Sequence, residues 1–162
     1  MSYLNYELNE DEKLIALIRK HWITLTLPLA KAIVAIAVIA ILAQKLFEFE
    51  YGKEIVFVWI ITSILYAVHE IIIWYLDCYI ITNKRIIDID QKNIFRRIVA
   101  EVGIENIQEV VYLTNGPLET ILGYGTVNVK TSSNGSMIGM EQIPNPVEVK
   151  DIIVNAKGQK YL

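Results

Sequence analysis

The stretches that decide the fold read WITLTLPLAKAIVAIAVIAILA, from Trp22 to Ala43, and IVFVWIITSILYAVHEIIIWYL, from Ile55 to Leu76. Each has 22 residues, which at about 1.5 Å of helical rise per residue reach ~33 Å and can cross a bilayer. The connection between them, Gln44 to Glu54, is short. The sequence therefore predicts an antiparallel transmembrane hairpin over residues 22–76, with both of its ends on the same side of the membrane.

The composition concentrates the apolar residues in these two blocks. The chain has 162 residues, of which 54% are hydrophobic, and its first twenty residues are polar with charges of both signs. A secretory signal peptide would instead begin with a short basic region followed by an apolar core. We therefore expect the first apolar stretch to remain in the mature protein, as part of a membrane anchor with one small appended domain.

The basic residues around the hairpin predict its orientation. Cytoplasmic flanks of transmembrane helices are enriched in Lys and Arg. The connection holds only Lys45 and Lys53, whereas the outer flanks hold Lys13, Arg19, Lys20, Lys84, Arg85 and Lys92. This bias predicts a multi-pass protein of the inner (plasma) membrane with both termini in the cytoplasm.

Residues 1–21 are predicted to form an amphipathic cytoplasmic lead-in to the hairpin. Asn9 is a good helix N-cap, and Glu12 stands where the acid of a capping box belongs. Apolar residues then recur at helical spacing, at Leu14, Leu17 and Ile18. The pattern favours a helix lying on the membrane surface, and a solvated helical extension is the alternative.

Residues 77–162 change to short β-rich runs separated by turn residues, which is typical of an antiparallel sheet. The predicted strands are Tyr79–Thr82, Arg85–Asp90, Ile94–Val102, Ile107–Leu113, a run containing Val127 and Val129, and Met137–Ile143.

A C-terminal helix is predicted after these strands. Asn145 is a good N-cap and Pro146 suits the first helical position. Gly158 stands where a left-handed C-terminal residue is often needed. The apolar stripe of this helix consists of Val149, Ile152, Ile153 and Ala156. The fold class is therefore membrane-anchored α+β, with a helical hairpin followed by a small antiparallel sheet that one helix covers.

Three blocks of residues 77–162 resemble the bacterial pleckstrin-homology-like domain family (the YdbS-like, DUF304 group). They read YIITNKRII from Tyr79, IENIQEV from Ile104 and LGYGTV from Leu122. The resemblance covers about half the chain, and the two helices before the domain are similar to those of membrane-anchored members. It implies a pleckstrin-homology-like β-barrel with a C-terminal capping helix, and it implies no reaction. The domain is compact for such a barrel, so one strand is expected to be short or missing.

Composition and motifs argue against several classes of function. The net charge is −3, and residues 77–162 are nearly balanced, with nine Lys and Arg against ten Asp and Glu. Nucleic acid is therefore not expected as a partner. A single cysteine, Cys78, and two separated histidines cannot build a zinc site. Because the sequence also lacks a catalytic triad and a P-loop, we expect no catalytic residues, no metal, no cofactor and no enzymatic activity.

Four basic residues of the predicted domain are candidates to face lipid or a partner: Lys84, Arg85, Arg96 and Arg97. Lys84 and Arg85 follow the second apolar stretch closely, so they can touch lipid phosphates or simply reflect the cytoplasmic charge bias, which we favour. Arg96 and Arg97 lie near Asp88, Asp90 and Glu101 in the predicted sheet. Cross-strand ion pairs are therefore their default role.

Lys31 and Glu70 are ionisable residues within the predicted spans, where a charge costs about 2.5–3.5 kcal/mol on insertion scales. If Trp22 and Leu76 are level, Lys31 and Glu70 lie about one helical turn apart in depth. We expect them to form an intramembrane pair that sets the register of the hairpin. Snorkelling of Lys31 towards the cytoplasm and a proton or ion path are the alternatives.

Three functions remain open from the sequence. The first is a non-enzymatic, membrane-anchored module that scaffolds or recruits a partner protein, or a second copy of itself, at the cytoplasmic membrane face. The second is a module that senses lipid headgroups. The third is a small transport or ion-path subunit using Lys31, His69 and Glu70. We favour the first because the balanced domain shows no convergent polar site, and strand addition of a peptide needs few specific side chains.

Overall fold

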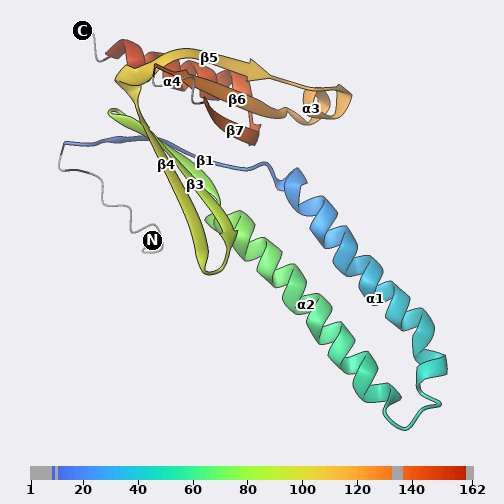
Figure 1. Cartoon of the computed structure of the whole chain (residues 1–162). Helices are drawn as coiled ribbons and strands as arrows, with labels where there is room; N and C mark the ends of the chain where they lie inside the picture. Colours follow the sequence, from blue (N-terminus) through green and yellow to red (C-terminus); the bar gives the residue numbers. More distant parts are fainter. Residues whose placement is uncertain (1–8, 10, 133–136, 160–162) are drawn as a thin grey trace. The chain divides into compact units, whose positions relative to one another are not determined.

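The computed structural model describes residues 9, 11–132 and 137–159. The chain forms two compact units (Figure 1). One unit contains Trp22–Leu76 and Gln91–Arg96, and the other contains the described residues of Met1–His21, Asp77–Asp90 and Arg97–Leu162. We call them the hairpin unit and the sheet unit.

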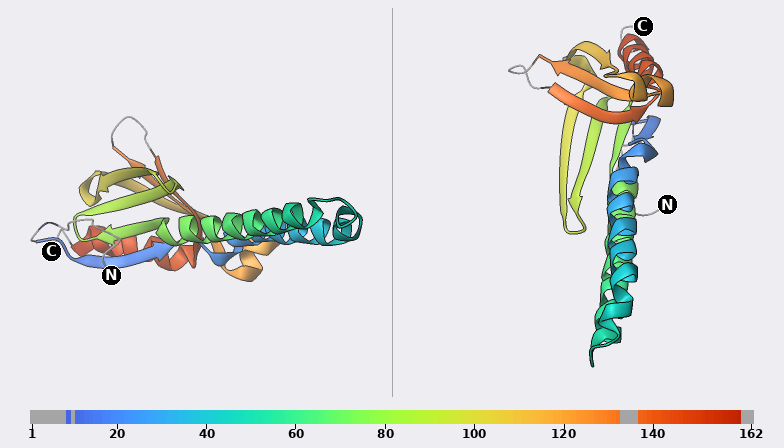
Figure 2. Two further views of the ribbon diagram at one scale, coloured as in Figure 1. Left: turned by 90° about the horizontal axis from the view of Figure 1, so that it is seen from below. Right: turned by 90° about the vertical axis from the view of Figure 1, so that its right-hand side faces the viewer.

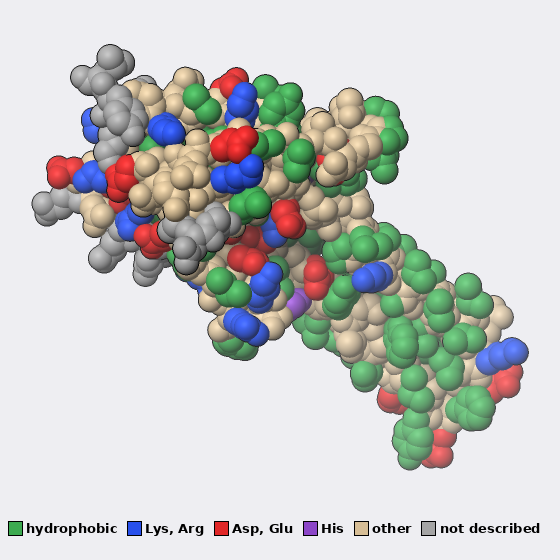
Figure 3. Space-filling view, turned by 45° about the horizontal axis from the view of Figure 1, so that its top comes forward, with side chains coloured by type: hydrophobic (Ala, Val, Ile, Leu, Met, Phe, Trp, Pro, Cys, Tyr) green, Lys and Arg blue, Asp and Glu red, His purple; other side chains and the backbone are tan. Residues whose placement is uncertain are grey.

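The hairpin unit contains the two predicted apolar helices. A 3₁₀ turn, η1 (Trp22–Leu25), leads into α1 (Thr26–Leu46), and α2 spans Gly52–Leu76. The segments Trp22–Leu46 and Gly52–Leu76 are each 25 residues long and apolar enough to cross a membrane. Most of their large apolar side chains are exposed, so hydrophobic groups dominate the helices on the face shown in Figure 3. A core helix of a soluble protein would bury such side chains, and these helices therefore suit a lipid environment.

Small residues and one side-chain hydrogen bond fix how α1 packs against α2. Ala32 and Ser63 are buried between the helices, where small side chains let helix backbones approach closely. The indole Nε1 of Trp59 donates to the backbone oxygen of Ala35 at 3.1 Å. At the tight turn, a Cβ on Gly52 would lie 1.7 Å from the Leu46 carbonyl oxygen, so only glycine fits there.

The first sheet of the sheet unit has the order β1-β2-β3-β4. Its strands are β1 (Leu14–Arg19), β2 (Cys78–Thr82), β3 (Arg85–Asn93) and β4 (Arg96–Gly103). The predicted strands after the hairpin are confirmed here, but β4 begins two residues later than predicted. Ile94 and Phe95 form the turn between β3 and β4 instead of the start of a strand.

The predicted helix before the hairpin is wrong, because Leu14–Arg19 forms the strand β1. Glu12 does form the local contact of a capping box, in which the Asn9 backbone N–H donates to its Oε2 at 3.2 Å. The chain then becomes extended and pairs antiparallel with β2, with Ile18 opposite Tyr79 and Arg19 opposite Cys78. Pairing with a distant strand here outweighs the local helical spacing.

This pairing makes the domain discontinuous in sequence. The prediction placed the domain wholly within residues 77–162, whereas its edge strand β1 precedes the hairpin. The hairpin is therefore inserted between two strands that pair with each other. The domain thus contains one strand, β1, that residues 77–162 do not supply.

The second sheet has the order β5-β6-β7. A 3₁₀ turn, η2 (Ile104–Asn106), leads into it from β4, and its elements are β5 (Ile107–Leu113), α3 (Pro117–Leu122), β6 (Tyr124–Thr131) and β7 (Met137–Pro144). The helix α4 (Pro146–Gln159) follows and packs against β5 and β6 (Figure 2).

The predicted closed barrel is not formed, because the strands make two separate sheets of four and three strands. The two sheets approach each other at one side, where the His21 backbone N–H donates to the Gln142 oxygen at 2.6 Å. Within the described residues, the outer edge of β4 pairs with no strand. The fold is therefore α+β, with two separate antiparallel sheets and one open side.

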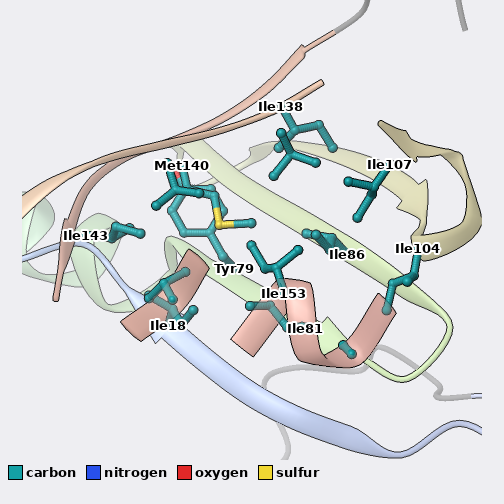
Figure 4. Close-up of a cluster of buried hydrophobic side chains, with 14 residues drawn as sticks. Ile18, Tyr79, Ile81, Ile86, Ile104, Ile107, Ile138, Met140, Ile143 and Ile153 are labelled. Carbon is teal, nitrogen blue, oxygen red and sulfur yellow. The ribbon is translucent and has the colours of Figure 1, made fainter. Parts of the chain in front are cut away.

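Between the sheets and α4 lies one main core. Figure 4 shows side chains from both sheets and the helix meeting there. The predicted stripe of α4 is confirmed, since Val149, Ile153 and Ala156 are buried in this core and Ile152 packs against it. Gly158, however, lies inside α4 without a left-handed backbone, so the predicted helix end is wrong.

Candidate functional site

Arg85, a predicted lipid-facing or partner-facing residue, lies in a network of ion pairs. Its Nε donates to Glu12 Oε1 at 2.9 Å, and its Nη2 donates to Glu12 Oε2 at 2.8 Å. Its Nη1 donates to Glu101 Oε2 at 2.8 Å. The hydroxyl of Thr82 adds a hydrogen bond to Glu12 Oε1 at 2.7 Å. Arg85 thus ties the segment before β1 to β3 and β4.

Glu12 is the buried member of this network, with a side chain that is 0% exposed. Burial by itself would raise the pKa of its carboxyl, because the ionised form loses hydration. The hydrogen bonds from Arg85 and Thr82 outweigh burial, so the pKa of Glu12 lies below its ordinary value. The network is therefore a charged, well-hydrogen-bonded structural centre, which the sequence analysis did not find.

Lys84 stands beside this network at the turn between β2 and β3. Its Nζ lies 4.0 Å from Asp11 Oδ2. Asn83 in the same turn accepts a hydrogen bond from the Lys13 backbone N–H at 2.8 Å. The turn is thus bound to residues 11–13, which leaves it poorly placed to act as an independent headgroup site.

The four basic candidates do not converge on one site. Arg85 begins β3, whereas Arg96 and Arg97 follow the far end of that strand. Nine strand residues at about 3.4 Å each separate the two ends by ~27 Å. Lys84 and Arg85 therefore cannot share a small ligand with Arg96 and Arg97.

The strand β4 is the most exposed strand of the first sheet and forms its open edge. Ile98 and Val99, on opposite faces of the strand, are 44% and 41% exposed. Ile98 shares its face with Ala100 and Val102, which pack against the core. The core is therefore uncovered at the start of β4, and apolar side chains flank a backbone edge that pairs with no described strand.

Two further surfaces escaped the sequence analysis. One is the turn before β4, where Phe95 is 99% exposed and Ile94 is 49% exposed. The other is an open hollow of about 420 Å³ between the end of β5, α3 and the start of α4, which Tyr112, Thr120 and Val147 help to line. The sequence signal for the exposed turn is the pair of consecutive apolar residues, Ile94 and Phe95, between polar neighbours. The same pair also suits a strand, and the sequence analysis therefore placed it at the start of Ile94–Val102.

The hairpin does not bring Lys31 and Glu70 together. Since Trp59 bonds to Ala35, the antiparallel register places Lys31 level with Ser63, and Glu70 lies seven residues, or about 10 Å, further along α2. Glu70 instead lies beside His69, the preceding residue of α2, with 3.5 Å between His69 Nδ1 and Glu70 Oε1. Lys31 is exposed and lines an open groove of about 680 Å³ with Ala35, Thr62 and Tyr66.

The described residues contain no group of three or more His, Cys, Asp or Glu that could hold a metal ion. Cys78 is buried with Ile80, Ile87 and Ile89. Burial raises the pKa of its thiol, which makes it a poor nucleophile. Cys78 therefore acts as a small buried apolar side chain.

Comparisons with known proteins bear on this architecture. The family model described as "Bacterial PH domain" matches residues 22–157, a range that includes both apolar helices. One solved structure, a DUF1696 family protein with a pleckstrin-homology domain from Shewanella loihica PV-4, is 20% identical. That match covers 50% of this chain and 70% of the other, with a TM-score of 0.42. No curated protein matches the chain.

Proposed function

Because the chain belongs to the bacterial PH domain family, we propose that it is a membrane-anchored module that recruits a protein partner through the open edge of β4. In this proposal the hairpin crosses the inner membrane and both termini lie in the cytoplasm. The excess of Lys and Arg on the outer flanks of the hairpin supports that orientation. The module has no catalytic activity of its own.

The observation that carries this proposal is the exposure of β4. An edge strand with free backbone groups is a template for a further strand. Proteins usually protect such edges with charge, bulges or covering segments, yet β4 presents Ile98 and Val99 beside its edge. A peptide added as a strand would satisfy the backbone groups and cover these two side chains, which is a common mode of peptide recognition.

Charge along β4 favours a particular kind of peptide. Arg96 and Arg97 are exposed at the start of the strand, and Glu101 further along is bound to Arg85. A partner segment with apolar residues opposite Ile98 and Val99, and an acidic residue near Arg96, would match this distribution.

The alternative functions draw less support from the geometry. Headgroup sensing by Lys84, Arg85, Arg96 and Arg97 together needs a convergence that these residues lack. An ion path through Lys31, His69 and Glu70 needs neighbouring ionisable groups across the hairpin, and Lys31 and Glu70 are about 10 Å apart in depth. A second copy of the chain remains a candidate for the partner at β4.

A photoreactive side chain at Val99 is expected to crosslink the full chain in native membranes to one discrete protein. The matched control is Val154 on α4, which is 47% exposed against 41% for Val99. Neither change is expected to alter the free energy of unfolding by more than about 0.5 kcal/mol, since both positions lie on the surface.

The products of the two positions decide the outcome. A protein adduct at Val99 that is missing at Val154, and that decreases when Ile98 is replaced by lysine, supports recruitment at β4. An adduct of the mass of a dimer identifies the partner as a second copy. Equal adducts at both positions, or adducts with lipid alone at Val99, would contradict the proposal.

A further inference from the structure

The turn between β3 and β4 exposes more apolar surface than a soluble loop normally does. In the β3–β4 tip, Gln91–Arg96, the turn is formed by Ile94, which is 49% exposed, and Phe95, which is 99% exposed. Polar and turn-forming residues are usual at such a position. Two adjacent apolar side chains exposed in this way therefore indicate a surface that binds a partner.

The tip is held in shape by its own hydrogen bonds. The side chain of Gln91 is buried, and its Nε2 donates to the backbone oxygens of Asn93 at 2.6 Å and Ile94 at 3.4 Å. These bonds rigidify the turn from within while Phe95 stays outside. The exposed ring is thus presented by a preorganised loop, which lowers the entropy lost on binding.

Charge and context identify the surface that the tip fits. Lys92 and Arg96 flank the two apolar residues and are exposed. Aromatic rings prefer the interfacial depth of a bilayer, and Lys and Arg beside them are attracted to anionic headgroups. The tip also forms one compact unit with the two apolar helices. If these helices cross a bilayer, the surface of that bilayer is the one that the tip can reach.

We propose that the β3–β4 tip inserts Phe95 and Ile94 into the interface of the bilayer that the hairpin crosses, with Lys92 and Arg96 on anionic headgroups. The tip is then a second, reversible membrane contact beside the hairpin. This proposal rests on the membrane anchoring of the hairpin and not on recruitment at β4, so either can fail without the other.

The test uses the full chain reconstituted in vesicles. An environment-sensitive fluorophore is attached to Asn93→Cys in a Cys78→Ala background, which leaves Ile94 and Phe95 intact. The matched control carries the same fluorophore at Asn155→Cys, an exposed asparagine on α4. Quenching by lipids that carry a spin label near the headgroup reports whether the tip lies in the interface.

In vesicles with a third of anionic phosphatidylglycerol, the fluorophore at position 93 is expected to be strongly quenched and the one at position 155 is not. Lys92→Gln with Arg96→Gln is expected to lower the ratio of inserted to free tip about 25-fold, at about fivefold for each charge. Phe95→Ser is expected to release the tip even when the charges remain.

Three results would overturn the proposal. The first is equal quenching at positions 93 and 155. The second is quenching at position 93 that persists unchanged in zwitterionic vesicles and in the variants, because the hairpin alone would then set the depth of the tip. The third is protection of position 93 from lipid by a bound protein in native membranes, which would assign the tip to a protein partner.

Discussion

Replacing Glu12 with glutamine is expected to destabilise the sheet unit by about 3 kcal/mol, which is a large share of the stability of a small domain. Removing one partner of a buried ion pair typically costs about 3–5 kcal/mol. We expect the lower end because the Arg85 side chain is 22% exposed and keeps Glu101. Denaturant unfolding of the full chain, followed by amide hydrogen exchange in peptides of the sheet unit, measures the change.

The matched control is Glu101→Gln, which removes the other carboxylate from the same guanidinium at the same distance of 2.8 Å. The Glu101 side chain is 39% exposed, and exposed ion pairs contribute about 0–1 kcal/mol. Similar losses in the two variants would contradict the central role of Glu12.

The same network predicts how stability depends on pH. The pKa of Glu12 in the folded protein lies below its ordinary value of 4.5, so the unfolded chain binds its proton more readily. The stabilisation is therefore fully present above pH 4.5 and is lost as the pH falls through the lower folded pKa. Glu12→Gln is expected to remove this acid-dependent loss, whereas Glu101→Gln retains it.

A fragment of residues 77–162 is expected not to fold cooperatively. It lacks β1, which covers the edge of β2 along Leu14–Arg19. It also lacks Ile18, which is buried in the main core, and Glu12, which holds Arg85. The summed loss is comparable with the whole stability of a typical domain, about 5–15 kcal/mol.

Joining β1 back to the fragment provides the control. Since Arg19 lies directly opposite Cys78, a short Gly-Ser linker in place of Trp22–Leu76 should span the gap. Lys20 and Asp77 lie beside the joint, with 2.7 Å between Lys20 Nζ and Asp77 Oδ2. The linked protein is expected to show dispersed amide NMR signals and a sharp thermal transition. Folding of the fragment alone to the same extent would show that the domain does not need β1.

Local sequence patterns predicted much of the architecture. The two apolar spans, β2, β5, β7 and the stripe of α4 each carry a periodicity that their neighbours in sequence are sufficient to reveal. The family resemblance from Asp77 to about Ala156 is likewise confirmed by the family match. In each of these elements, the apolar face and the flanking turns are determined by residues close together in the sequence.

Structural features that depend on contacts between residues far apart in the sequence could not be predicted. Leu14, Leu17 and Ile18 fit a helix when they are read alone, and only the strand β2, some sixty residues away, makes them extended. The register of the hairpin depends on the contact of Trp59 with Ala35, which no count from the membrane boundaries reveals. Likewise, the open side of the sheets depends on how strands from both halves of the domain meet.

The apolar hairpin is inserted between β1 and β2, two strands of the domain that pair with each other. Arg19→Cys tests this insertion most directly, because the new thiol would face Cys78, the one cysteine of the chain. Directly opposed residues have Cβ atoms about 4.5–5.5 Å apart, close to disulfide range. Oxidation is done at mildly alkaline pH, since burial raises the pKa of Cys78.

Free thiols are then counted by mass-tagging after denaturation of the full chain from membranes. We expect an intramolecular disulfide in Arg19→Cys and two free thiols in the control Ile15→Cys, whose position lies four residues before Arg19 in β1. Two free thiols in both variants, or disulfides formed only between chains, would contradict the insertion of the hairpin between β1 and β2.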